Sequence, residues 1–173
     1  MKHTLVRYGL ISGGISAALM IGVTLIFHYI GFDKIGFDKS MYIGYGSILA
    51  AMSVVFFAVR THREQNQGTI TFGKGLLIGL GVTLISCVIY SLAWMVVYYN
   101  FIPTFIDDYS AYCIKKAEST GASKAELEAT MTQLSQMKEW YKSPLMIFLL
   151  TLMEPLPVGV LISLISAGVL RRK

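Results

Sequence analysis

Charged residues are scarce in this 173-residue chain. They make up 14% of the sequence, whereas about 25% is usual in soluble domains, and 54% of the residues are hydrophobic. A composition of this kind excludes an ordinary soluble domain. It is typical of an integral membrane protein.

Cysteine and catalytic motifs are also scarce. The two cysteines are Cys87, in a long apolar block, and Cys113, in the polar segment after it, so we expect no disulfide bond and no nucleophilic or metal-binding thiol. The three histidines lack the spacing of metal ligands, and no glycine-rich phosphate loop joins a strand to a helix. We therefore expect a protein that is not an enzyme, with no catalytic residues, metal or cofactor.

The hydrophobic residues form four long blocks. A membrane core of about 30 Å requires roughly 20 apolar residues per helix, and each block is near that length. The first exceeds the apolar region of a signal peptide and precedes no small-residue cleavage site, so we expect it to be a retained anchor. The sequence predicts an all-α integral membrane protein, a single membrane domain over residues 1–173 with four transmembrane helices at about 5–30, 41–59, 75–99 and 144–170.

The charges predict an orientation. The N-terminus, the segment 60–74 and the C-terminus would share one side, which has eight basic residues and one acidic residue, a net charge of +7. The other side has seven basic and eight acidic residues, a net charge of −1. Because basic residues near helix ends resist translocation, we expect both termini in the cytoplasm. The basic side would face anionic lipids of the bilayer and indicates no nucleic-acid partner.

The polar segment 100–143 is too long for a plain connector. Two amphipathic helical stretches can be recognised in it, separated by a break around Gly121. The second opens with Ser123 and Glu126, which have the spacing of a capping box. The segment therefore predicts an extracytoplasmic helical hairpin between the third and fourth spans.

Small residues recur at four-residue intervals within the blocks, where they let helices approach closely. We expect them to pack the bundle internally, and only a strip without an internal neighbour would indicate a partner. The strips are Gly9, Gly13 and Ala17; Gly46 and Ala50; Gly75 and Gly79; and Gly159, Ser163 and Ala167.

Aromatic residues lie mostly near the predicted ends of the blocks. Amphipathic rings at such positions anchor helices at the membrane interface, so we expect anchors and not a cofactor site. They include Tyr8, Trp94, Tyr98, Tyr99, Trp140 and Tyr141.

Glu154 is the one clear ionisable residue inside a span, and an intramembrane charge is costly enough to indicate a function or a partner. It precedes Pro155. Either it is a protonatable carboxylate in a broken helix, or it caps a new helix that begins at Pro155. The 16 residues that follow it would form about 24 Å of helix, which favours the cap. Matching depths makes His28 the expected partner, with Tyr90 or Trp94 as hydrogen-bond donors.

Three stretches resemble the DUF4199 family: 66–75 before the third block, the break at 121–123, and 154–159 leading to 163–173. The resemblance covers nearly the whole chain. It implies a small multi-span inner-membrane protein, chiefly of Bacteroidota, with no established function. It also implies a link to a glycosyltransferase and so to envelope glycolipid chemistry. The least generic positions, to which no role is attached, are Gly68, Phe72, Lys74, Glu154, Pro155 and Gly159.

The sequence favours a non-enzymatic scaffold or accessory subunit of a membrane complex. It would act as a homo-oligomer or with another membrane protein, for which the resemblance suggests the glycosyltransferase. The alternative is a small transporter or channel that uses a protonatable Glu154.

Overall fold

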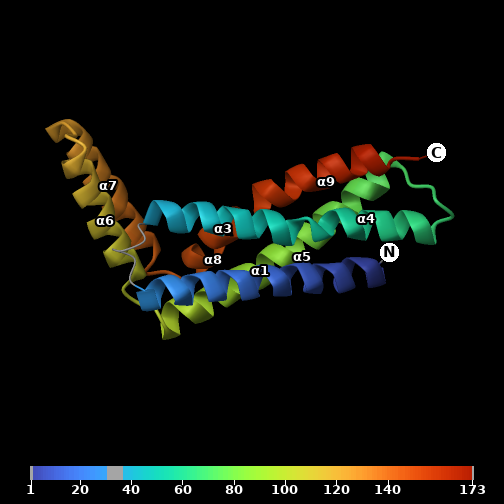
Figure 1. Ribbon diagram of the computed structural model, residues 1–173, viewed down its shortest axis with the longest axis horizontal. Coiled ribbons are helices and arrows are strands. Elements are labelled where there is room, and N and C mark those ends of the chain that lie inside the picture. The colour runs from blue at the N-terminus through green and yellow to red at the C-terminus, as the bar shows by residue number, and fades with distance from the viewer. Residues whose placement is uncertain (1, 31–36, 173) are drawn as a thin grey trace.

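The computed structural model describes residues 2–30 and 37–172, and Figure 1 shows its course. Within these ranges all regular elements are helices. They are α1 (Lys2–Ile30), α3 (Phe37–Met52), α4 (Val54–Gln65), α5 (Phe72–Asn100), α6 (Phe105–Ser119), α7 (Lys124–Trp140), α8 (Pro144–Met153) and α9 (Leu156–Leu170).

Four candidate membrane spans are present in the described residues, which confirms the predicted all-helical architecture. α3 and α4 follow each other directly and form one span, and α8 and α9 form another across the break at Glu154. The spans are 27 to 29 residues long, enough by length and composition to cross a membrane: His3–Ile30, Phe37–Gln65, Phe72–Asn100 and Pro144–Leu170.

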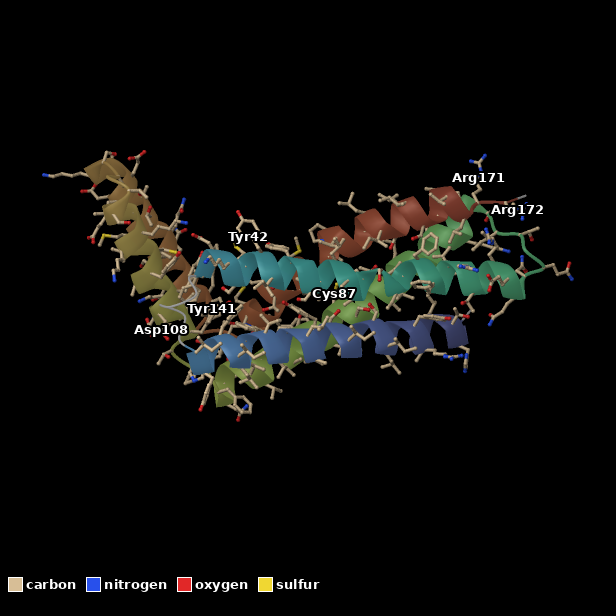
Figure 2. The ribbon with its side chains drawn as sticks, viewed as in Figure 1. Tyr42, Cys87, Asp108, Tyr141, Arg171 and Arg172 are labelled. Carbon is tan, nitrogen blue, oxygen red and sulfur yellow. The ribbon has the colours of Figure 1, made fainter. Side chains whose placement is uncertain are left out.

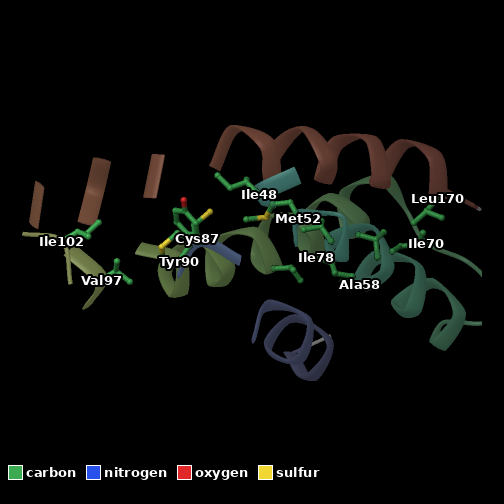
Figure 3. Packing of buried hydrophobic residues seen from close by; sticks show 14 residues of the cluster. Ile48, Met52, Ala58, Ile70, Ile78, Cys87, Tyr90, Val97, Ile102 and Leu170 are labelled. Atoms are coloured by element: carbon green, nitrogen blue, oxygen red, sulfur yellow. The ribbon is translucent and has the colours of Figure 1, made fainter. Parts of the chain in front are cut away.

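The third span, α5, is the centre of the bundle, because its contacts with α1 and α9 are the most extensive between any two helices described. α4 closes the half of the bundle near the termini by packing on α1, α5 and α9. Figure 3 shows the core that results, which follows α5 from Ile102 at one end to Ile70 and Leu170 at the other.

Small residues bring these helices close together. A Cβ atom added at Gly9 would lie 2.7 Å from the Ile85 side chain, and one at Gly13 would lie 2.6 Å from Ile89. Glycine is therefore required where α1 crosses α5.

The contact between α5 and the fourth span is equally tight. A Cβ atom added at Gly79 would lie 2.7 Å from Ser163, and one at Gly75 would lie 3.3 Å from Ala167. Three of the four small-residue strips are thus used for packing within the bundle. In the fourth strip Gly46 and Ala50 are exposed, and no atom lies within 4 Å of a Cβ added at Gly46.

The predicted hairpin is present as α6 and α7. Gly121 takes a left-handed conformation (φ 75°) in the turn, and the capping box of Ser123 and Glu126 forms in full. Figure 1 shows both helices projecting from the end of the bundle opposite to the marked termini.

Two kinds of contact fasten the hairpin to α3. Asp38 accepts hydrogen bonds from Lys116 Nζ at 2.6 Å and from the Tyr112 hydroxyl at 3.1 Å. The Phe37 ring packs on Tyr109 and Tyr112, with ring centroids 5.5 and 5.1 Å away. The hairpin is therefore joined to the bundle by its first helix.

Candidate functional site

A cavity of about 680 Å³ lies at the hairpin end of the bundle. Residues of α1, α3, α5, α6, α7 and α8 line it, and ligand-binding cavities commonly have this size. Ten of the 26 lining residues are aromatic: Phe27, Phe37, Tyr45, Tyr90, Trp94, Phe105, Tyr109, Tyr112, Trp140 and Tyr141.

Both tryptophans of the chain, Trp94 and Trp140, are among the lining residues. The sequence predicted them as interfacial anchors, and the structure adds that they belong to one cavity. Figure 2 shows Tyr141, which follows Trp140, where the hairpin meets the bundle. The ring contact between Trp94 and Phe105, at 5.0 Å, joins the α5 wall to the α6 wall.

The fourth span is interrupted beside this cavity. α8 ends at Met153 and α9 begins at Leu156. Pro155 and Pro157 have no N–H group and cannot donate to the carbonyls four residues earlier; the N–H of Glu154 instead donates to the Thr151 carbonyl at 3.3 Å. The predicted break is therefore present.

The Glu154 side chain lines the cavity and accepts a hydrogen bond from the Tyr90 hydroxyl at 3.1 Å. Tyr90 was one of the two donors expected from the sequence. Pro155 occupies the N-cap position of α9, where no side-chain capping bond forms. The structure places the Glu154 carboxylate in the cavity wall, and the helix-cap interpretation stays a prediction.

His28, the partner expected from depth matching, is exposed and does not line the cavity. The neighbouring Phe27 is 7% exposed and does line it. Successive side chains on a helix point about 100° apart, so a residue at the correct depth can still face away. Depth alone could not select the partner of Glu154.

Further hydroxyl groups lie around the carboxylate. Tyr141 interacts electrostatically with Glu154, and Tyr90 interacts with Tyr45 and Tyr141. Burial, and then the negative charge of Glu154, raises the pKa of Tyr141 to about 12. The buried indole nitrogen of Trp94 lies close to Tyr141 at a geometry short of a full hydrogen bond. A carboxylate surrounded by aromatic side chains results.

The same cavity has a second polar group where α3 meets the hairpin. Asp38 and Lys116 both line it and form the ion pair described above, each about half exposed. The hydrogen bond to Asp38 raises the pKa of Lys116 above its ordinary value. This lysine therefore remains charged and paired in neutral solution.

Three lining side chains indicate where the cavity opens. Met41 and Tyr45 on α3 are 52% and 46% exposed, and Met153 on α8 is 59% exposed. We infer an opening between α3 and α8, on the side of the bundle that lipid would cover.

The motif positions before the third span lie at the opposite end of the bundle. Gly68 takes a left-handed conformation (φ 79°) in the turn after α4. Phe72 is the first residue of α5, and the backbone N–H of Lys74 donates to the side chain of the N-cap residue Thr71. These residues shape a turn and begin a helix. Gly159, by contrast, lies in α9 directly against Thr83, where a larger side chain would collide.

The part of the chain that the structure describes contains no group of three or more His, Cys, Asp or Glu side chains able to hold a metal ion. Cys87 is buried and Cys113 partly buried, and both are free. The described carboxylates that line the cavity are Glu154, bonded to Tyr90, and Asp38, paired with Lys116.

Four apolar spans and a helical hairpin define a multi-pass membrane protein of the all-helical class. The profile described as "Protein of unknown function (DUF4199)" matches residues 7–172. The chain therefore belongs to the DUF4199 family, as its sequence motifs predicted. Comparison with curated proteins and with solved structures finds no match.

Proposed function

We propose that this DUF4199 protein is a non-enzymatic accessory membrane protein that binds an amphipathic molecule in the cavity at the hairpin end of the bundle. The observation that carries this proposal is the cavity itself, about 680 Å³, with many aromatic lining residues and two carboxylates, Glu154 and the ion-paired Asp38. Apolar walls with a few placed polar groups are typical of ligand sites.

The distribution of polar groups supports an amphipathic ligand. Glu154 and Tyr90 form one polar point inside a span, and Asp38 with Lys116 forms another beside the hairpin. Methionine and aromatic side chains lie around them, including Met20 from α1. A molecule with one polar group and an apolar chain could bind the polar side chains with its polar group and the methionine and aromatic side chains with its chain.

Binding accounts for the cavity better than transport does. No residue of α4 or α9, both fully described, lines it. The side chains of Met52, Val55 and Ile78, from α3, α4 and α5, are fully buried in the core and fill the bundle between the cavity and the termini. A transporter would need a second conformation that opens this layer.

Within the described residues, the pairing of Glu154 with a tyrosine supports a non-enzymatic role. The hydrogen-bond partner of Glu154 is a tyrosine, and general acid–base catalysis usually needs a second group of suitable pKa within reach of the substrate. We therefore favour binding over a membrane-bound hydrolase or transferase.

Tryptophan fluorescence can test the proposal, because both tryptophans line the cavity. The protein would be reconstituted with phospholipids whose acyl chains carry bromine, which quenches tryptophan on contact. The variant Gly44→Leu should reduce quenching, since Gly44 lines the cavity and no atom lies within 4 Å of a Cβ added there. Mass spectrometry of the purified protein should show less co-purified lipid.

The matched control is Gly46→Leu. Gly46 is on the same helix, also has open space at its Cβ, and does not line the cavity. Its quenching should equal that of the parent protein. Equal quenching and equal lipid content in both variants would contradict the proposed binding site.

A second role, association with a partner, is favoured by the exposed strip of Gly46 and Ala50. The other three small-residue strips have neighbours within the bundle, and this one does not. We propose that it contacts another membrane protein, as an accessory subunit requires. Affinity purification of parent protein and Gly46→Leu from native membranes should show loss of a stoichiometric partner in the variant; an unchanged set of partners would exclude this surface.

A further inference from the structure

The charge of Glu154 has no positive partner among the residues that the structure describes. The ion pairs found there involve Glu64, Asp38, Asp107 and Glu139. Glu154 instead accepts the hydrogen bond from Tyr90. A carboxylate at the depth of a membrane span is costly and is usually paired, so a ligand in this cavity is the available source of a positive charge.

The surroundings of Glu154 have a composition that suits an organic cation. Tyr90 donates a hydrogen bond to the carboxylate, and Tyr45 and Tyr141 line the same cavity. Trp94 lies beside Tyr141. Aromatic faces attract ammonium groups through their quadrupoles, and cages of several such rings recognise quaternary ammonium ions.

We infer that the cavity takes a ligand with an ammonium group, which binds between the Glu154 carboxylate and the rings of Tyr45, Tyr90 and Tyr141. This inference rests on the proposed binding function and adds the chemical class of its ligand, an amphipathic amine. The apolar part of the ligand extends toward Met41 and Met153 at the opening between α3 and α8.

Two other ligand classes fit less well. An inorganic cation such as Ca²⁺ or Mg²⁺ needs several oxygen ligands, and no cluster of that kind exists among the described residues. A neutral polyol could stack on the aromatic rings but would leave the carboxylate charge unbalanced. Among the described residues, the one cationic side chain in the cavity wall is Lys116, which is already paired with Asp38.

The test compares two probes of equal chain length, octyltrimethylammonium and octanol. Binding to the full chain in a neutral detergent is followed by tryptophan fluorescence and by calorimetry, with subtraction of the signal from empty micelles. The parent protein should bind the ammonium probe more tightly than the alcohol. Glu154→Gln should weaken binding of the ammonium probe about tenfold or more, because the negative charge that attracts the ammonium group is lost, and leave binding of the alcohol unchanged.

Glu118→Gln is the charge control, because Glu118 is an exposed carboxylate of the hairpin outside the cavity. If Glu154→Gln fails to fold, Tyr45→Leu replaces it. This variant should weaken ammonium binding about threefold through loss of a cation–π contact, whereas Tyr42→Leu, an exposed position that does not line the cavity, should have no effect. In Figure 2 Tyr42 lies on the outer face of α3.

The outcomes separate this inference from the proposed function. Equal affinity for both probes, with binding abolished by Gly44→Leu, would leave the cavity as a binding site and overturn the ammonium assignment. Unchanged ammonium affinity in Glu154→Gln would also overturn it. Loss of ammonium binding alone in Glu154→Gln, with Glu118→Gln unaffected, would support it. No binding of either probe, together with equal lipid quenching in Gly44→Leu and Gly46→Leu, would contradict the binding function itself.

Discussion

The Tyr90 hydroxyl on α5 donates a hydrogen bond to the Glu154 carboxylate, 3.1 Å away and 64 residues later in the chain. The bond joins the central helix to the point where the fourth span is broken. Tyr90 is 5% exposed, so its hydroxyl has little access to water. The same hydrogen bond therefore holds two spans together and positions the carboxylate that lines the cavity.

Removing the hydroxyl should destabilise the protein. Tyr90→Phe removes this hydrogen bond, which is part-buried because Glu154 is an exposed residue, and an intramolecular hydrogen bond contributes about 0.5–1.5 kcal/mol net. We expect a lower midpoint of thermal unfolding, followed by circular dichroism in detergent. Tyr99→Phe, at an exposed tyrosine of the same helix, should leave the midpoint unchanged, and equal midpoints for both variants would show that the bond contributes nothing.

Two adjacent glycines of α1 should respond oppositely to alanine. A Cβ at Gly13 would lie 2.6 Å from Ile89 Cδ1 and 2.9 Å from its Cβ, whereas Gly14 has no atom within 4 Å. Gly13→Ala should destabilise the bundle by about 1–3 kcal/mol through overpacking. Gly14→Ala should be neutral or stabilising by up to about 1 kcal/mol, because alanine favours the helix. Denaturant unfolding would rank them, and the reverse order would contradict the crossing of α1 and α5.

Lowering the pH should destabilise the first turn of α7. Hydrogen bonds from Ser123 hold the pKa of Glu126 below its ordinary value. A carboxyl group with a lowered folded pKa stabilises the fold above its unfolded pKa, and this contribution is lost as the pH falls through the folded pKa. Hydrogen exchange at the first turn of α7 should therefore rise in acid. Glu126→Gln should abolish this dependence, whereas Glu128→Gln should retain it.

The topology can be tested with two reporters. Gly121 lies at the turn of the hairpin, and Arg172 forms a bridge with Ile70 at the other end of the bundle. Four spans place these ends on opposite sides of the membrane. An enzyme reporter active only outside the cytoplasm should work at Gly121 and fail at the C-terminus; activity at both sites would contradict the four-span topology.

The sequence was sufficient for features that depend on local information. Block lengths predicted the spans, and the capping box of Ser123 and Glu126 and the break at Pro155 depend on residues within a few positions of each other. The cavity was not predictable in this way, because it depends on how α1, α3, α5 and the hairpin are rotated. The choice of Phe27 over His28 as a lining residue, and the meeting of Trp94 with Tyr141, are consequences of that rotation.

The small-residue strips were recognisable from their spacing, but the helices against which they pack were not. That Gly79 packs on Ser163 while Gly46 stays exposed depends on which helices lie side by side. The expected role of His28 failed for the same reason.

The break in the fourth span makes α8 a separate rod of ten residues, about 15 Å long at 1.5 Å per residue. One end follows α7 after a connection of three residues, 141–143, and the other end carries Glu154. This short helix thus connects the hairpin outside the bundle to the Glu154 carboxylate. Because α8 itself packs on α5 through the buried Ile147 and Thr151, the helix that follows the hairpin also holds Glu154 against Tyr90.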